Sequence, residues 1–392
     1  MRADSNRKTR NNLAHFITTM LVTLVITYAA VIYTNIPFIS KYRDIYIETA
    51  MSTMSHQWLA TSFIPKSVID DVINKRDSMD IKKGNGNNGF IAQVKKLYNL
   101  KGRKWFVAEF DEIDMNSFDN YVDNNTDVVN DGYENILIDK SKVGDSETGI
   151  VTKQGDNVVA VDAKNKIMII EVKGNGYNGR LAIAKDASKV KVGLAEGVGQ
   201  DLANEGSQID QVADYNNAIL SINASGFNDS DGNGDGGQPI GTIIQQGNVI
   251  NPAIGGAWFT VGFDYSDRMI VGRDIADGNL RDAVEFRPAL IIDGVRQVDG
   301  SSGWGIQPRT AVGQKANLDV LMLVIDGRQI NHSIGATVGD CADIMERYGA
   351  VQSCNLDGGC SSIMYYNNHP VTIPPIRYDV GRWIPNVLMV EN

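Results

Sequence analysis

Near its C-terminus the chain reads Asn355-Leu356-Asp357-Gly358-Gly359-Cys360-Ser361-Ser362-Ile363-Met364. The residues before Asp357 have the apolar pattern of a strand, so this carboxylate comes directly after a strand end. The two glycines let backbone amides approach a ligand closely, and the two serines add hydroxyl groups. A carboxylate, amides and hydroxyls gathered in so short a run predict a functional site.

The sequence ahead of this run predicts a strand, a helix and a second strand. Residues 318–325 are almost wholly apolar, as expected for a buried strand. Thr337 can cap a helix together with Asp340, and Gly349 can end that helix before the strand that leads to Asp357. Because a right-handed crossover joins parallel strands, we expect the two strands to be parallel neighbours.

Two aspartates follow these strands directly, Asp326 after the first and Asp357 after the second. Both would then project from the same carboxyl edge, where open α/β sheets bind their ligands. The alternative is that each aspartate only stabilises its own Asp-Gly turn. The glycine pair and the serines favour function at Asp357, whereas both interpretations stay open for Asp326.

From Tyr133 onward, short apolar runs alternate with turn residues. Residues 151–161 and 167–170 have the spacing of β-hairpins. Together with the helix expected after Thr337, they predict an α+β fold with a mixed β-sheet core and packed helices. A single N-terminal transmembrane helix is expected to precede this core.

That expected helix is residues 13–38, which are uncharged and almost wholly apolar. The stretch exceeds the roughly 20 residues that a helix needs to cross a bilayer. Basic residues precede it, so the positive-inside rule places the N-terminus in the cytoplasm and the rest of the chain outside the cell membrane. A cleaved signal peptide is the alternative, but its apolar core is shorter and ends at a small-residue site. We therefore expect a cytoplasmic tail (1–12), a transmembrane anchor (13–38), a partly helical extracytoplasmic stem (39–132) and one large domain (133–392).

The charge and the cysteines exclude several classes of protein. A formal net charge of −10 argues against a nucleic-acid partner, which would require a basic face. The three cysteines form no C-x-x-C pair, so a structural zinc site is not expected. An oxidising location would permit a bridge between Cys341 and Cys354, although buried unpaired cysteines are common.

The loop at residues 229–235 matches the first half of a calcium-binding EF-hand loop. Its candidate ligands are Asp229, Asp231, Asn233 and Asp235. However, Ile240 stands where a bidentate glutamate is expected, and no helix is predicted to flank the loop. Ordinary loop chemistry is therefore favoured, and no cofactor is expected.

Six blocks in order resemble the phosphodiester glycosidase family. They are Asn223-Ala224-Ser225-Gly226-Phe227, Pro308 to Gly313, Asp326-Gly327-Arg328, Ser333 to Thr337, Leu356-Asp357-Gly358-Gly359, and Arg382 to Asn386. The resemblance covers about residues 133–392. Many relatives have a third glycine where this chain has Cys360, which leaves the shape of that loop open. The chain as a whole looks most like membrane-anchored bacterial members associated with exopolysaccharide or cell-wall metabolism.

The resemblance implies an extracytoplasmic hydrolase that cleaves a glycosyl-1-phosphodiester bond in a surface glycan or its precursor. Its partners would be that phosphorylated glycan and, through the N-terminal helix, the membrane. The alternative is a non-catalytic glycan-binding or exopolysaccharide-assembly protein on the same fold. A transferase that moves the sugar to another hydroxyl would share the first step.

This chemistry requires a carboxylate at the anomeric carbon and donors on the phosphate. The phosphate leaves without a strong general acid, because the second pKa of a phosphate monoester is about 6. Asp357 suits the carboxylate, as nucleophile or as base for water, and Arg309 with the glycine amides suits the phosphate. The other acid or base candidates are Asp326, Glu285 and His332. The predicted binding residues are Asn223, Arg309, Thr310, Gly358, Gly359, Ser361, Ser362 and Arg382.

Several of these candidates have a structural alternative. Arg309 could form an ion pair, Arg382 could brace the last strand, and Asn223 could cap a turn. For His332, between two polar residues, a structural role is the stronger interpretation.

Overall fold

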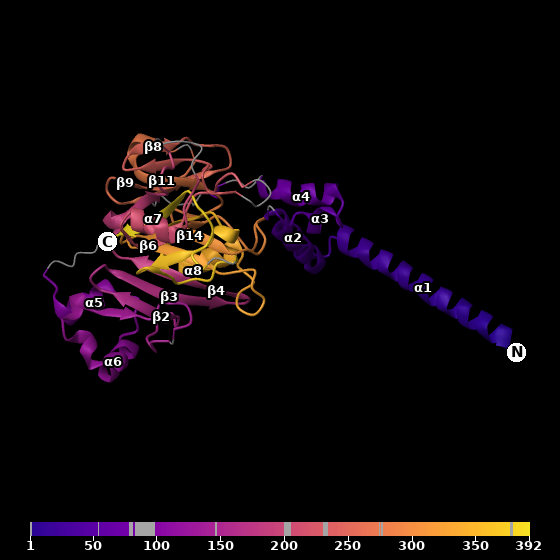
Figure 1. Cartoon of the computed structure of the whole chain (residues 1–392), viewed down its shortest axis with the longest axis horizontal. Helices are drawn as coiled ribbons and strands as arrows, with labels where there is room; N and C mark the ends of the chain where they lie inside the picture. The colour runs from indigo at the N-terminus through magenta and orange to yellow at the C-terminus, as the bar shows by residue number, and fades with distance from the viewer. Residues whose placement is uncertain are drawn as a thin grey trace. The chain divides into compact units, whose positions relative to one another are not determined.

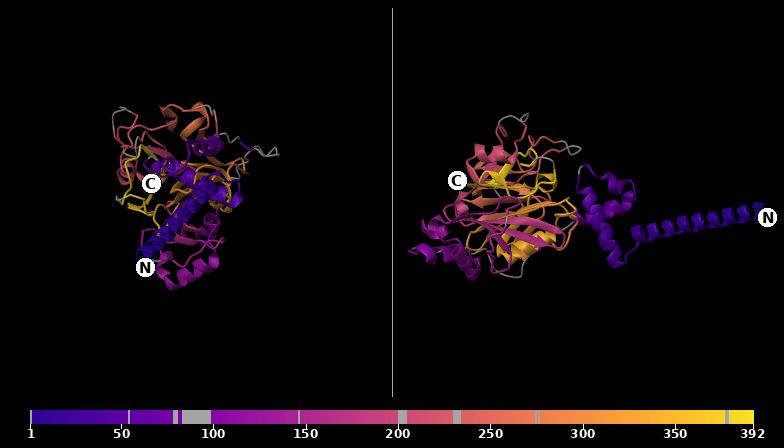
Figure 2. Two further views of the ribbon diagram at one scale, coloured as in Figure 1. Left: turned by 90° about the vertical axis from the view of Figure 1, so that its right-hand side faces the viewer. Right: turned by 60° about the horizontal axis from the view of Figure 1, so that its bottom comes forward.

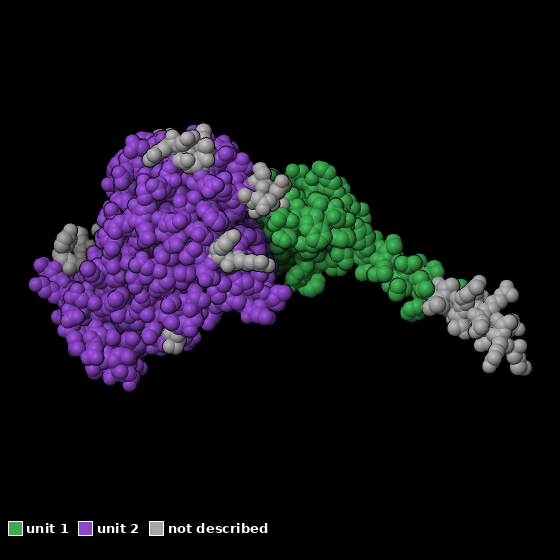
Figure 3. Space-filling model, in the orientation of Figure 1, with its two compact units in different colours: residues 1–79 green, residues 80–392 purple. Residues whose placement is uncertain are grey.

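The computed structural model describes residues 2–53, 55–77, 81–82, 99–145, 147–199, 205–229, 234–273, 275, 277–376 and 379–392. The chain divides into two compact units, residues 1–79 and residues 80–392 (Figure 3).

The first unit is entirely helical where it is described. Its helices are α1 (Arg2–Tyr33), α2 (Pro37–Met51), α3 (Trp58–Thr61) and α4 (Lys66–Asp77). Within α1, His15–Tyr33 has a mean hydropathy of 2.0 and is long and apolar enough to cross a membrane. The three shorter helices cluster at its C-terminal end (Figure 2), where Ile32 packs into a small core with Ile47.

The second unit is built around a nine-stranded sheet. In spatial order its strands are β1 (Leu137–Asp139), β2 (Asn157–Asp162), β3 (Ile167–Gly174), β4 (Tyr177–Ala184), β15 (Val320–Ile325), β14 (Arg309–Lys315), β16 (Ala350–Asn355), β12 (Ala289–Ile292) and β13 (Val295–Arg296). Strands β3, β4, β15 and β14 are long and apolar, so they bury side chains on both faces of the sheet.

Two five-stranded sheets complete the β-structure. One has the order β10 (Met269–Gly272), β9 (Phe259–Asp264), β11 (Leu280–Phe286), β7 (Ile243–Gln245) and β8 (Asn248–Asn251). The other has the order β18 (His369–Pro370), β17 (Met364–Tyr366), β6 (Ala218–Asn223), β19 (Asn386–Glu391) and β5 (Val190–Leu194). Their apolar side chains share one core with one face of the large sheet.

Helices cover the other face of the large sheet (Figure 1). They are α5 (Gly102–Glu109), α6 (Met115–Asn124) and α8 (Val338–Arg347), while α7 (Ile209–Tyr215) packs on the sheet that contains β6. The predicted cap of α8 is confirmed, because the Asp340 amide donates to Thr337 Oγ1 and the Thr337 amide donates to Asp340 Oδ2. The α+β fold class is likewise confirmed.

The predicted neighbour relation of the two strands flanking α8 is wrong. Strand β14 lies between β15 and β16 and is antiparallel to both. The two strands are therefore parallel to each other but separated by one strand, at roughly 10 Å, or two strand spacings. Asp326 and Asp357 still leave the sheet at the same edge, on either side of the start of β14.

Two other expectations need correction. Residues 101–129, assigned to the stem, belong to the second compact unit, because Phe106, Phe110 and Phe118 are fully buried against the large sheet. A bridge between Cys341 and Cys354 is excluded by position. Cys341 packs on the helical face of the sheet and Cys354 on the opposite face, and both are free.

Candidate active site

The loop that carries Asp357 is fixed by its backbone. The Asp357 amide donates to the Ala224 carbonyl at 3.0 Å, and the Asp357 carbonyl accepts from Asn223 Nδ2 at 2.6 Å. The Leu356 amide donates to the Thr310 carbonyl at 2.8 Å. Strands β6 and β14 therefore hold the backbone of this residue from both sides, and its side chain starts from a defined position.

The Asp357 carboxyl group is surrounded by protein but keeps some access to solvent. Desolvation raises its pKa from the usual 3.8 to about 6, although hydrogen bonds from Ser361 and the Gly358 amide and the charge of Arg382 act in the opposite direction. A carboxyl group with a pKa near 6 ionises close to neutral pH, as acid and base catalysts do. The structure thus brings together three of the predicted site residues, Asp357, Ser361 and Arg382.

Asn223 and Thr310 support this loop from within the core. Both side chains are buried, and Thr310 Oγ1 donates to Asn223 Oδ1 at 2.7 Å. Asn223 Oδ1 also accepts from the Ile363 amide at 3.1 Å. Their polar atoms are used within the fold, so these two residues position Asp357 and do not face a ligand.

The amides of Gly358 and Gly359 were expected to be free for a ligand, but both form hydrogen bonds within the protein. The Gly359 amide donates to the Pro308 carbonyl at 3.0 Å, and the Gly358 amide hydrogen-bonds Asp357 itself. A Cβ atom at position 358 would lie 2.9 Å from the Pro308 carbonyl oxygen, so glycine is required there by packing. Ser362 is also buried, at 1% exposure. The amides of Gly358 and Gly359 are thus used within the loop, whereas Ser362 Oγ is buried without a hydrogen-bond partner in the described chain.

Arg309 is placed in the interior and not at the predicted phosphate site. Its exposure is 4%, Nε donates to the Ala336 carbonyl at 3.1 Å, and Nη2 donates to the carbonyls of Trp304 and Gly305 at 2.7 and 2.8 Å. A guanidinium group that ties three carbonyls together in the core stabilises the loop ahead of β14. The sequence could not distinguish this role from phosphate binding.

Arg382 faces Asp357 and also fixes a neighbouring loop. Nη1 donates to Asp229 Oδ2 at 2.7 Å, Nη2 donates to the Gly234 carbonyl at 2.8 Å, and the guanidinium group lies 4.6 Å from the centre of the Phe227 ring. Burial alone would raise the pKa of Asp229, but the hydrogen bond from Arg382 outweighs this effect, so the pKa is lowered.

This arrangement bears on the calcium hypothesis. Asp231 and Asn233 lie outside the described residues. Asp229 uses Oδ1 to accept from the Gly234 amide and Oδ2 for Arg382, so a guanidinium group occupies the place of a cation at this carboxylate. Asp235 Oδ1 accepts from the Gly237 amide. The contacts are those of an ordinary turn.

Arg328 is a second cation at the Asp357 loop and is not among the site residues predicted from the sequence. It sits at the corner after β15 with a φ of 60°, and its side chain is exposed. Nη2 donates to Gln307 Oε1 at 2.8 Å, and Nη1 lies 3.0 Å from Cys360 Sγ. In the part of the chain that the structure describes, no carboxylate lies within 4.0 Å of this guanidinium group. Its charge is therefore available to an anion.

The sequence held a signal for Arg328, because it belongs to the Asp326-Gly327-Arg328 block. Gly359 makes room for it: a Cβ atom there would lie 3.2 Å from Arg328 Nη2, and the φ of 60° at Gly359 already disfavours other residues.

Asp326 and His332 form a pair at the same edge of the sheet. Asp326 is buried, its Oδ2 lies 2.7 Å from His332 Nε2, and its Oδ1 accepts from the Ile373 amide at 2.9 Å. The His332 side chain is 30% exposed. Asp326 therefore orients the imidazole ring and has no oxygen without a partner.

Glu285 is held in the sheet that contains β11 and does not join Asp357. It is 2% exposed and accepts hydrogen bonds from the backbone amides of Thr242, Ile254 and Gly255 at 2.9, 2.9 and 3.1 Å. These contacts fix the chain before β7 and after β8. The structure gives Glu285 a structural role.

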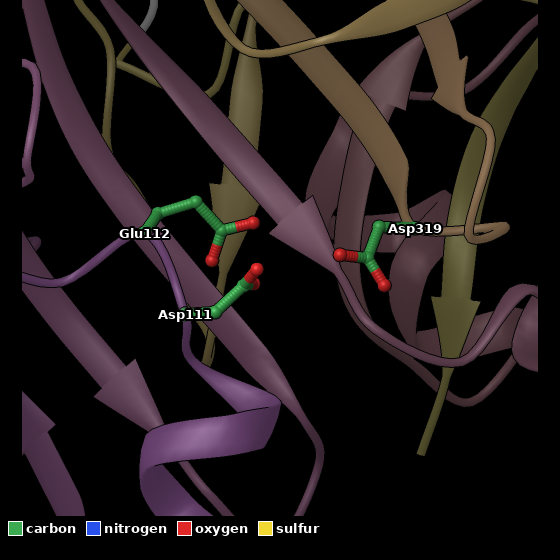
Figure 4. A group of neighbouring side chains, drawn as sticks. All are labelled: Asp111, Glu112 and Asp319. Carbon is green, nitrogen blue, oxygen red and sulfur yellow. The ribbon is translucent and has the colours of Figure 1, made fainter. Parts of the chain in front are cut away.

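A group of carboxylates at the opposite end of β15 could suggest a metal site. Figure 4 shows Asp111, Glu112 and Asp319 turned toward one another. The Lys185 ammonium group occupies their centre, with Nζ 2.6 Å from both Glu112 oxygens and 3.0 Å from Asp319. Burial alone would raise the pKa of Glu112. The charges of Lys185 and Lys315 outweigh this effect and lower the pKa to about 2. These residues form a buried ion network and not a metal centre.

Comparisons with known proteins identify the domain that holds the Asp357 site. Residues 216–391 match the family model described as phosphodiester glycosidase. The matched segment is thus similar to phosphodiester glycosidases over slightly less than half of the chain. All of the candidate site residues, from Asn223 to Arg382, lie within it. No curated protein matches the chain.

Among solved structures, the chain is similar to the catalytic domain of zebrafish N-acetylglucosamine-1-phosphodiester alpha-N-acetylglucosaminidase, auto-inhibited by its pro-peptide. The identity is 19% and the TM-score is 0.47, over 58% of this chain and 82% of that one. A Synechocystis protein described as hypothetical matches at 15% identity and a TM-score of 0.43, over 57% of this chain and 61% of that one.

Proposed function

We propose that the protein is an extracytoplasmic hydrolase that cleaves a glycosyl-1-phosphodiester bond in a surface glycan or its precursor. The family domain supports the reaction class. The observation that carries the proposal is the Asp357 carboxyl group, which has a pKa near 6 and is accompanied by the guanidinium groups of Arg382 and Arg328.

In the proposed reaction, the bond between the anomeric carbon and the phosphate oxygen breaks. The bonding electron pair leaves with the phosphate, which becomes a monoester, and a water oxygen becomes bonded to the sugar carbon. The ionised Asp357 either accepts a proton from that water or attacks the carbon first and is released by water. Both routes need the negatively charged Asp357 carboxylate next to the anomeric carbon.

The departing phosphate gains negative charge, which requires a cation that is in place before the reaction. Arg328 supplies that cation, because Gln307 and Cys360 orient its guanidinium group and no carboxylate of the described chain neutralises it. Arg382 is held by Asp229 and stabilises the ionised form of Asp357. This assignment replaces Arg309 as the phosphate-binding residue.

The pair of Asp326 and His332 lies next to Arg328 in the chain and can serve the leaving group. The imidazole ring is oriented through Nε2, so Nδ1 is the ring nitrogen that Asp326 does not contact. Nδ1 could donate a hydrogen bond to the departing phosphate oxygen, but the reaction does not depend on it, because the phosphate leaves without a strong acid.

The proposed location is the outer face of the cell membrane, with α1 as a single-pass anchor. The span His15–Tyr33 and the basic residues ahead of it support this placement. Carbonate extraction of membranes that contain the full chain, with protease added from outside, tests both the anchoring and the orientation.

The activity is tested directly with synthetic glycosyl-1-(methyl phosphate) diesters of N-acetylglucosamine, glucose and galactose. We expect the full chain to release a reducing sugar and methyl phosphate from at least one of them. Binding of all three without release would instead favour the glycan-binding alternative. Transfer of the sugar to an added alcohol would identify a transferase.

A further inference from the structure

The first unit carries an unusual amount of exposed apolar surface outside α1. Six large apolar side chains between residues 36 and 63 are 45% to 71% exposed: Ile36, Phe38, Tyr42, Tyr46, Trp58 and Phe63. We call these six residues the apolar collar. The isolated collar would be unfavourable in water, and surfaces of this kind mark a membrane or protein contact.

Hydrogen bonds fix the collar beside the end of α1. Tyr28 Oη donates to the Phe63 carbonyl at 2.6 Å. Arg43 Nη1 donates to the carbonyls of Ile32 and Thr34 at 2.8 and 3.1 Å, so α2 caps the C-terminal end of α1. The short helices therefore fold back along the last turns of the apolar span.

This contact sets the depth of the collar along α1. Tyr28 precedes the last residue of the span, Tyr33, by five positions, which corresponds to about 7 Å along the helix axis. Phe63 thus lies beside helix residues that belong to the apolar span. Interfacial helices bury their apolar faces about 5–10 Å into the boundary between headgroups and acyl chains.

Apolar and charged side chains are exposed mainly on different helices of this unit. The collar residues come from the segments around α2 and α3 and are mostly aromatic, as is typical of membrane–water interfaces. Charged side chains are fewer there: α2 exposes Lys41, whereas α4 exposes Lys66, Asp71 and Lys75. A separate small core, which includes Ile47 and Ile64, is buried between the helices, and the collar residue Tyr46 is tied to this unit through its Oη, which donates to the Leu59 carbonyl at 2.8 Å.

We infer that the apolar collar lies in the headgroup region of the outer leaflet, so that residues 36–64 rest on the bilayer instead of lifting the chain away from it. The occupant of this surface is lipid, because the collar continues the lipid-facing surface of α1, whose span is only 6% buried. The inference rests on the proposed membrane span. It replaces the expected stem at this end of the chain with an interfacial platform.

The test uses the full chain reconstituted at a low protein-to-lipid ratio in phosphatidylcholine vesicles brominated near the headgroup end of the acyl chains. Trp58 is one of five tryptophans, and bromine quenches only those in contact with lipid. We expect strong quenching in the wild type, loss of most of it in Trp58→Phe, and no change in Trp383→Phe. Trp383 is a matched control because it is also exposed, at 37%. Both variants keep an aromatic ring and are expected to fold.

Equal quenching of the wild type and Trp58→Phe would overturn the inference. Protection of Trp58 that rises with protein concentration and is insensitive to bromine would also overturn it, since a second copy would then cover the collar. If the protein resists reconstitution and is extracted by carbonate, the proposed anchor fails. If it reconstitutes but Trp58 is not quenched, only the inference about the collar fails.

Discussion

Arg328 Nη1 lies 3.0 Å from Cys360 Sγ, and this contact joins the corner after β15 to the loop that carries Asp357. Gln307 holds the same guanidinium group from the other side at 2.8 Å. A cation fixed by a thiol and an amide, and not by a carboxylate, keeps its charge for an incoming anion. Cys360 therefore contributes a contact that fixes this guanidinium group.

Removal of the Arg328 charge should weaken phosphate recognition. Hydrogen bonds to charged groups contribute about 1.5–3 kcal/mol, so Arg328→Met is expected to raise KM, and the inhibition constant of inorganic phosphate, by about 10-fold or more. Arg328→Lys should lie between the two. Arg103→Met removes an exposed arginine that is paired with Asp119 and serves as the control with unchanged kinetics. Equal phosphate inhibition in all four proteins would contradict the assignment.

The pH dependence of activity follows from the raised pKa of Asp357. The proposed reaction needs the ionised carboxylate, so kcat/KM should rise with pH through about 6 and level off above it. A profile of initial rates between about pH 4.5 and pH 8 measures this value. Activity that instead falls as pH rises through 6 would show that the protonated form of Asp357 is the active one.

The same pKa predicts how Asp357→Asn changes stability. The folded-state pKa is raised from 3.8 to about 6, so the wild type loses stability as pH rises from about 4 to about 6, while the variant does not. The free energy of unfolding of Asp357→Asn should therefore rise relative to that of the wild type across this window, by on the order of 3 kcal/mol, and the difference should stay constant at higher pH. Urea unfolding at several pH values measures the difference. A constant offset at all pH values would refute the raised pKa.

The buried ion network should be costly to break. Lys185→Met leaves Glu112 and Asp319 without their shared cation and is expected to destabilise the second unit by about 3–5 kcal/mol. The control Lys173→Met removes the exposed partner of the partly buried Glu171 and should cost less than about 1 kcal/mol. Because the pKa of Glu112 is lowered to about 2, the contribution of the network is present above about pH 4.5 and is lost as pH falls toward 2. Thermal unfolding that is the same for both variants would exclude this role.

Local patterns in the sequence predicted local features well. The capping of α8 by Thr337 and Asp340 and the strand ends at Asp326 and Asp357 depend on neighbouring residues, and the structure shows them. The insertion of β14 between β15 and β16 is a long-range pairing, which periodicity within either strand does not encode.

The roles of the polar residues were harder to predict, because residue type does not reveal burial. Arg309 and Glu285 have the chemistry of site residues, yet both form hydrogen bonds with backbone groups in the interior. Arg328 was overlooked because its importance comes from the absence of a carboxylate partner in the described chain, which only coordinates show. The burial of Phe106 and Phe118 against the large sheet was hidden in the same way by the acidic residues around them.

The central claim is that the ionised side chain of Asp357 acts on the sugar carbon. The most direct measurement compares Asp357→Asn with the wild type on one hydrolysed glycosyl-1-(methyl phosphate) diester, with turnover from released sugar and affinity from calorimetry. The account predicts that kcat falls by at least about 1000-fold, a loss of about 4 kcal/mol of transition-state stabilisation, while affinity changes little. Turnover by Asp357→Asn at a rate close to that of the wild type would contradict it.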